Sequence, residues 1–129
     1  MAKSSLRLLH VRIPAYSHPR NEWRKKIHEA VQKEMEAAGI KKGSYENRRL
    51  EIRARIYFLD KKDLDRHDVD NRLKDIMDAL QGRMGGSKKV HEFETFIPND
   101  AQICSVSICK QLASPQSKNR GHVEIREYR

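Results

Sequence analysis

The stretch of the chain with the clearest structural pattern is residues 48–59, which have the sequence RRLEIRARIYFL. Apolar side chains occupy every second position from Leu50 to Phe58, and charged or polar side chains fill the positions between them. Successive side chains of a β-strand point to opposite faces, so this alternation predicts a half-buried strand. Arg53 and Arg55 then lie on its solvent-facing side.

The segments on both sides of this strand predict one mixed α/β unit. Residues 6–13, 102–112 and 122–128 have the composition of strands. An amphipathic helix with Trp23 on its core face is predicted between Asn21, its expected N-cap, and Gly39, its expected C-terminal stop. From Val69 to Leu80, apolar residues recur at helical spacing and predict a second main helix. The chain has 129 residues and no internal repeat. We therefore expect a single small domain, residues 1–129, with a mixed sheet of about four strands and two main helices.

Charge is distributed unevenly along the sequence. The formal net charge of +9 predicts a polyanionic partner, because clustered lysine and arginine attract phosphates. Residues 1–59 carry +8, residues 60–78 carry −2 and residues 79–129 carry +3. The acidic middle window holds every aspartate except Asp100 and contains no glutamate. No apolar run reaches the roughly 18 residues of a membrane span, so we expect a cytoplasmic protein with no membrane partner.

The start of the second main helix combines two carboxylates with a lysine. Asp68 is expected at the N-cap, Asp70 in the first turn and Lys74 one turn further on. Two carboxylates about 4 Å apart repel by ~4 kcal/mol at an effective dielectric near 20, which a divalent cation offsets. Mg²⁺ commonly takes one or two protein carboxylates together with waters and phosphate oxygens. The alternative is purely structural: Asp68 caps the helix, and Asp70 pairs with Lys74.

Three short motifs extend this pattern along the chain: Asp68-Val69-Asp70-Asn71-Arg72-Leu73-Lys74, Asp78-Ala79-Leu80 and Asn99-Asp100-Ala101-Gln102-Ile103. Together they resemble the D-x-D-N-x-x-K, DAL and acid-AQ motifs of the RusA family of Holliday-junction resolvases, which are crossover junction endodeoxyribonucleases. The order of predicted strands and helices over residues 6–128 is also similar. The resemblance implies a RusA-like fold and paired hydrolysis of phosphodiester bonds in four-way DNA junctions during recombination and repair.

The resemblance also implies roles for individual residues. Asp68, Asp70 and Asp100 are expected to bind Mg²⁺, with Mn²⁺ as an alternative ion, and Lys74 to be the essential lysine. The metal would polarise the scissile phosphate and lower the pKa of a bound water, while Lys74 stabilises the developing charge. The implied partners are branched DNA and a second copy of the chain. The residues expected to contact DNA are Arg53, Arg55, Arg66, Asn71, Arg72, Lys88 and Lys89.

Other functions compete with this interpretation. Pro98-Asn99-Asp100 followed by Glu124-Ile125-Arg126 faintly resembles the PD-(D/E)xK nucleases, but the lysine is missing. A non-catalytic, structure-specific DNA-binding protein is a second alternative. A basic RNA- or ribosome-associated domain is a third, although such a domain needs exposed aromatic side chains, and Trp23 and Phe58 lie on core faces. His67, beside Asp68, is expected to be a surface histidine.

Overall fold

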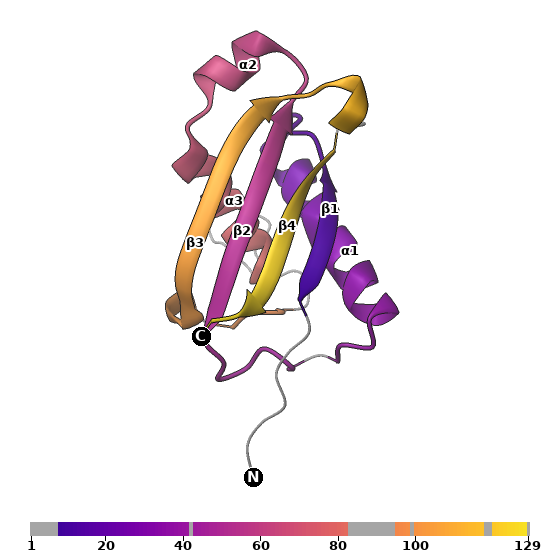
Figure 1. Cartoon of the computed structure of the whole chain (residues 1–129), viewed down its shortest axis with the longest axis vertical. Helices are drawn as coiled ribbons and strands as arrows, with labels where there is room; N and C mark the ends of the chain where they lie inside the picture. The colour runs from indigo at the N-terminus through magenta and orange to yellow at the C-terminus, as the bar shows by residue number, and fades with distance from the viewer. Residues whose placement is uncertain (1–7, 42, 83–94, 99, 118–119, 129) are drawn as a thin grey trace.

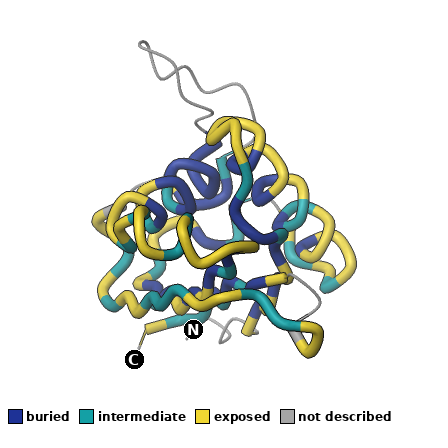
Figure 2. The backbone as a smooth tube through the Cα atoms, turned by 90° about the horizontal axis from the view of Figure 1, so that it is seen from above, coloured by how far each residue is buried: buried dark blue, intermediate teal, exposed yellow. Residues whose placement is uncertain are grey.

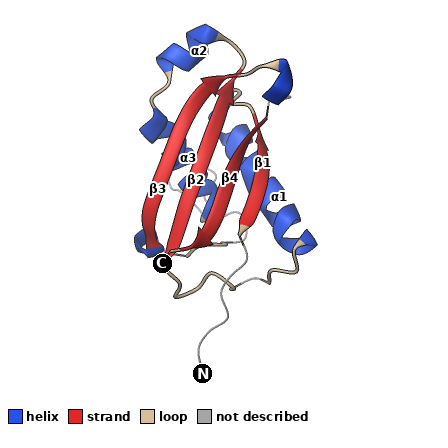
Figure 3. Ribbon diagram, viewed as in Figure 1, coloured by secondary structure: helices blue, strands red, loops and turns tan. Residues whose placement is uncertain are grey.

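The computed structural model describes residues 8–41, 43–82, 95–98, 100–117 and 120–128. Its described part is a four-stranded mixed β-sheet with the helices α1 and α3 packed on one face (Figures 1 and 3). This is the α+β architecture that the sequence predicted. The elements in chain order are β1 (Leu9–Pro14), α1 (Arg20–Ala37), β2 (Leu50–Phe58), α2 (Lys61–Arg66), α3 (Val69–Leu80), η1 (Asp100–Gln102), β3 (Ile103–Leu112), η2 (Pro115–Ser117) and β4 (Arg120–Glu127).

The strand predicted from residues 48–59 lies inside the sheet. The strand order is β1-β4-β2-β3, with β2 antiparallel to β4 and parallel to β3. A parallel pair needs a connection that returns the chain to the same end of the sheet. The described helices α2 and α3 lie on this connection, and α3 returns the chain along the sheet (Figure 1).

The core lies between the sheet and the two long helices, as the burial colours of Figure 2 show. Ile52, Ala54, Ile56 and Phe58 of β2 are buried, whereas Arg53 and Arg55 face solvent on the other side of the sheet. Trp23 of α1 is fully buried, and its Nε1 donates a hydrogen bond to the carbonyl oxygen of Pro14 at 3.0 Å. One face of the sheet is therefore covered, and the other carries polar and charged side chains. We call the latter the open face.

One helix starts earlier than the sequence predicted, and another was not predicted. α1 begins at Arg20, and its N-cap is Pro19, two residues before the predicted N-cap Asn21. α2 was not predicted, because none of its residues is buried and it has no apolar periodicity. Its start is fixed by Asp60, whose carboxylate accepts a hydrogen bond from the backbone N–H of Asp63 at 2.9 Å. α3 has the predicted bounds.

Candidate metal and nucleic-acid site

Asp68 and Asp70 lie together at the N-terminal end of α3. Asp68 is the N-cap residue in an extended conformation, and Asp70 is in the first helical turn. Both residues are exposed, as is Lys74 one turn further along the helix. The N-terminal end of a helix carries a partial positive charge, which stabilises carboxylates there. The structure thus brings three of the four predicted catalytic residues to one exposed helix end.

The purely structural interpretation of these residues does not hold. Asp68 makes no side-chain capping hydrogen bond. Within the described part of the chain, the ion pairs include none between Asp70 and Lys74, although α3 contains an ion pair at i, i+3 between Arg72 and Asp75. Neither carboxylate is therefore occupied by a role within its own helix, and both are available to a ligand.

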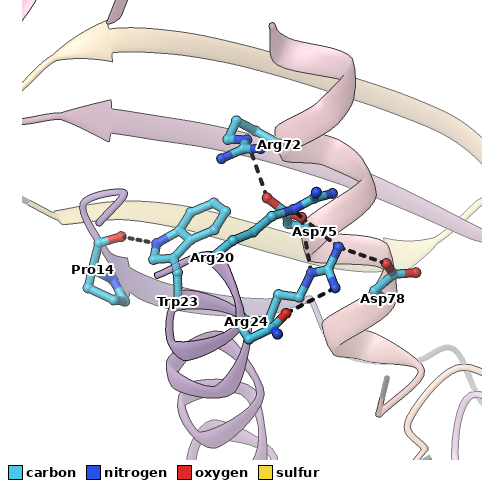
Figure 4. Close-up of polar contacts among 8 residues, drawn as sticks. Pro14, Arg20, Trp23, Arg24, Arg72, Asp75 and Asp78 are labelled. Carbon is cyan, nitrogen blue, oxygen red and sulfur yellow. Dashed lines mark hydrogen bonds and ion pairs between the residues drawn. The ribbon is translucent and has the colours of Figure 1, made fainter. Parts of the chain in front are cut away.

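α3 is held in place by a buried cluster of ion pairs on the side that faces α1 (Figure 4). The carboxylate of Asp75 is fully buried, and its Oδ1 accepts hydrogen bonds from Nε of Arg20 at 2.5 Å and Nε of Arg24 at 3.0 Å. Arg24 also contacts Asp78 at 3.2 Å. Two of the seven aspartates of the acidic window thus join α3 to α1.

Arg72 belongs to this cluster, so its predicted contact with DNA is wrong. Its guanidinium is buried and lies 4.3 Å from the centre of the Tyr16 ring, in a cation–π contact. Nε of Arg72 is 3.3 Å from Oδ2 of Asp75, close enough for an ion pair but without the alignment of a hydrogen bond. A side chain enclosed in this way positions α3 and presents no charge to a nucleic acid.

A second group of metal-ligating side chains lies directly before α3. His18, Asp63 and His67 have donor atoms that all lie within 4.8 Å of one another. The ring of His67 stacks on Phe58, with 5.4 Å between the ring centres. Burial lowers the pKa of His67, and the positive charge of Arg72 lowers it further. His67 was expected on the surface and is half-buried. Asp63 and His67 are four residues apart, but nothing in the sequence indicated that His18, much earlier in the chain, lies beside them.

Lys110 fixes the backbone next to the cluster of His18, Asp63 and His67. Lys110 Nζ of β3 donates hydrogen bonds to the carbonyl oxygens of Leu64 and His67, the latter at 2.9 Å. These contacts anchor the end of α2 and the residue before Asp68 to the edge of the sheet. The position of the aspartate pair is therefore set by β3 as well as by α3.

Asp100 comes after the C-terminal end of α3 in the chain. It begins η1 directly before β3, whose first residue, Ile103, pairs with Leu50 at the start of β2. The preceding chain is tied to the C-terminal end of α3, because the backbone N–H groups of Phe96 and Ile97 donate to the carbonyl of Leu80. The 12 residues of α3 span about 18 Å. The structure does not bring Asp100 to Asp68 and Asp70 within one chain.

The predicted DNA-contacting residues fall into separate places. Arg66 and Asn71 are exposed beside the aspartate pair, at the end of α2 and in the first turn of α3. Arg53 and Arg55 are exposed on the open face, and Arg53 contacts Glu51 at 3.1 Å. Lys88 and Lys89 lie outside the described residues. The N-terminal end of α3 thus holds two of the three predicted metal ligands, close to Arg66 of α2, and the open face forms a different surface.

The chain matches no protein-family model and no curated protein. Within the described residues, no helix combines the length and apolar character needed to cross a membrane.

Proposed function

We propose that this chain is a Mg²⁺-dependent endodeoxyribonuclease that cuts four-way DNA junctions, with Mn²⁺ as an alternative ion. The observation that carries the proposal is the pair of exposed carboxylates of Asp68 and Asp70, which neither cap α3 nor pair with Lys74. The resemblance of the surrounding motif to the RusA family supplies the substrate class.

The residues present suit a hard divalent cation. Mg²⁺ is commonly bound by one or two carboxylates, and its remaining positions are filled by waters and phosphate oxygens. Asp68 and Asp70 provide that number of carboxylates. Bound there, Mg²⁺ would polarise a phosphate and acidify a coordinated water. Lys74, one helical turn away, offers a positive charge to the phosphoryl oxygens as negative charge develops on them.

A role for Asp100 at the metal site requires a homodimer. The resemblance assigns Asp100 to the same cation, yet Asp100 and the Asp68–Asp70 pair are separated by the length of α3. We therefore propose that the partner's Asp100 completes each metal site. A dimer would then contain two sites, each with ligands from both chains. A junction with two strands to cut matches two such sites.

Substrate selection is the first test. The protein is mixed with a four-way junction or with a linear duplex of matched sequence, each in Mg²⁺ and in Ca²⁺. We expect cutting of the junction in Mg²⁺, binding without cutting in Ca²⁺, and little cutting of the duplex. Equal cutting of both substrates would leave a nuclease and remove the junction assignment. Junction binding without cutting in Mg²⁺ or Mn²⁺ would favour the non-catalytic DNA-binding protein.

A mixing experiment tests the shared site. Asp70→Asn and Asp100→Asn are each expected to be inactive alone. In an equal mixture, half of the dimers pair one variant with the other, and each of these has one intact site. Nicking should then return to about a quarter of the wild-type rate if the chains exchange freely. No recovery after refolding the mixed chains would contradict a site that spans two chains, and full activity of Asp100→Asn alone would remove Asp100 from the chemistry.

A further inference from the structure

The open face carries a group of side chains that the proposed nuclease site does not use. It lies where β1 runs beside β4, on the face of the sheet that α1, α2 and α3 do not cover (Figure 1). His10 projects from β1, and His122 and Glu124 project from β4. They alternate along their strands with buried residues such as Leu9, Val11 and Val123, which places them on the solvent side.

The geometry brings the three donor groups to one point. The strand register sets His10 directly opposite Glu124, and His122 is two residues from Glu124 on the same strand face. The imidazole rings of His10 and His122 are tilted by 31°, with 5.1 Å between their centres. One donor atom from each of the three residues lies within 4.8 Å of the other two. Ligands carried by paired strands are positioned more rigidly than ligands on loops.

We infer that His10, His122 and Glu124 form a binding site for a divalent transition-metal ion such as Zn²⁺. Two imidazoles and one carboxylate are a ligand set typical of zinc sites with an open coordination position. Mg²⁺ prefers oxygen ligands, so this site differs in metal preference from the aspartate pair on α3. The inference is independent of the nuclease proposal.

The ion pairs of the open face leave the carboxylate of Glu124 available to a metal ion. Glu51, the other acidic residue on this part of the open face, contacts Arg53 at 3.1 Å and Arg126 at 3.3 Å. Among the described residues, Glu124 makes no ion pair, although the register places it beside Arg53. Its charge is thus free to offset part of the charge of a bound cation.

The surroundings leave room for an ion and its remaining ligands. His10 and His122 line a surface hollow of about 200 Å³, together with Arg12, Arg55 and Arg120. Glu124 lines a second hollow of about 320 Å³, which shares His122 and Arg55 with the first. These arginines oppose a bare cation, so the site needs the carboxylate of Glu124 as well as the two imidazoles. They also favour an anionic group in the open coordination position, such as inorganic phosphate.

The test measures Zn²⁺ binding by the full chain, purified without a polyhistidine tag and stripped of metal. Equilibrium dialysis counts the bound ions, and Co²⁺ substitution gives an absorption spectrum that reports the ligands. We expect His122→Asn and Glu124→Gln each to lower the count by one ion per chain, or to weaken binding at least tenfold. Both positions are partly exposed, so circular dichroism should show an intact fold.

The matched control is His67→Asn, which alters the other histidine cluster, formed by His18, Asp63 and His67. It should leave the open-face ion and its Co²⁺ spectrum unchanged. Absence of Zn²⁺ binding by the wild-type chain would overturn the inference. An ion count and affinity unchanged in both His122→Asn and Glu124→Gln would also overturn it. Neither result would bear on Mg²⁺-dependent cutting, which is measured separately.

Discussion

Replacing Asp75 with asparagine tests the idea that a buried ion-pair cluster holds α3, and with it the aspartate pair, against α1. The side chain of Asp75 is fully buried, while those of Arg24 and Arg72 are only 7% and 6% exposed. Asparagine has nearly the same shape as aspartate, so the substitution removes charge without creating a cavity. It leaves two buried guanidinium groups with one carboxylate, that of Asp78, in contact with Arg24.

The expected loss is large for a single substitution. Removing one partner of a buried ion pair costs about 3–5 kcal/mol, because the remaining charge stays desolvated and unpaired. Arg20 adds little to this loss, since its side chain is 43% exposed and can return to water. With a urea dependence of about 1–3 kcal/mol per molar, the unfolding midpoint should fall by at least about 1 M.

The assay is urea unfolding followed by circular dichroism, with Asp65→Asn as the matched control. Asp65 is an exposed aspartate of α2 that pairs with Lys61 at 3.7 Å, and its side chain is 63% exposed. The same substitution there should cost no more than about 0.5 kcal/mol. A loss below about 1 kcal/mol for Asp75→Asn would refute the claim that the cluster anchors α3.

Three further predictions concern packing, pH and DNA contacts. Gly121→Ala should destabilise the fold by at least about 1–3 kcal/mol, because the added Cβ would lie 2.1 Å from the backbone oxygen of Arg55. Urea unfolding measures this loss, and unchanged stability would contradict the close approach. Burial raises the pKa of Tyr45 from 10.0 to about 12. The neutral phenol is thus favoured in the folded state, and stability should fall as pH rises from about 10 to 12. Tyr45→Phe should remove this part of the alkaline loss in pH-dependent unfolding, and an identical pH profile would count against it. Arg66→Ala should lower the slope of log binding constant against log salt concentration for junction binding by about one unit. Arg53→Ala, on the open face, should change this slope less. The reverse order would place DNA on the open face.

Local patterns in the sequence predicted the main elements of the fold. The alternation in residues 48–59 identified β2, and the apolar spacing from Val69 to Leu80 identified α3, because each element buries one face against the core. The pattern could not identify α2, which buries none of its residues and owes its start to the cap at Asp60. Amphipathic periodicity reports burial, and a short helix that buries none of its residues has no such signal.

The candidate site was predictable only in part. Asp68, Asp70 and Lys74 are neighbours within one helix, so their spacing alone placed them together. The role of Arg72 depends on Asp75 and on the ring of Tyr16, which lies 56 positions earlier in the sequence. Asp75 lies three residues further along α3, but the sequence gives no local sign that Tyr16 covers the Arg72 guanidinium.

Long-range pairing also decided the positions of the histidines and of Asp100. The cluster of His10, His122 and Glu124 depends on the register between β1 and β4, more than 100 residues apart in the chain. The distance from Asp100 to the aspartate pair depends on the direction of α3 along the sheet, which periodicity does not contain. Both features follow from topology rather than from residue spacing.

The most direct test of the account separates cutting from binding in Asp70→Asn. Junction cleavage in Mg²⁺ and junction binding in Ca²⁺ are measured for this variant, for Asp65→Asn and for the wild-type chain. We predict that Asp70→Asn abolishes cleavage and still binds the junction, because losing a carboxylate does not weaken attraction to phosphate, while Asp65→Asn cuts normally. Wild-type cleavage rates in Asp70→Asn would contradict the claim that the free carboxylates at the start of α3 hold the catalytic metal.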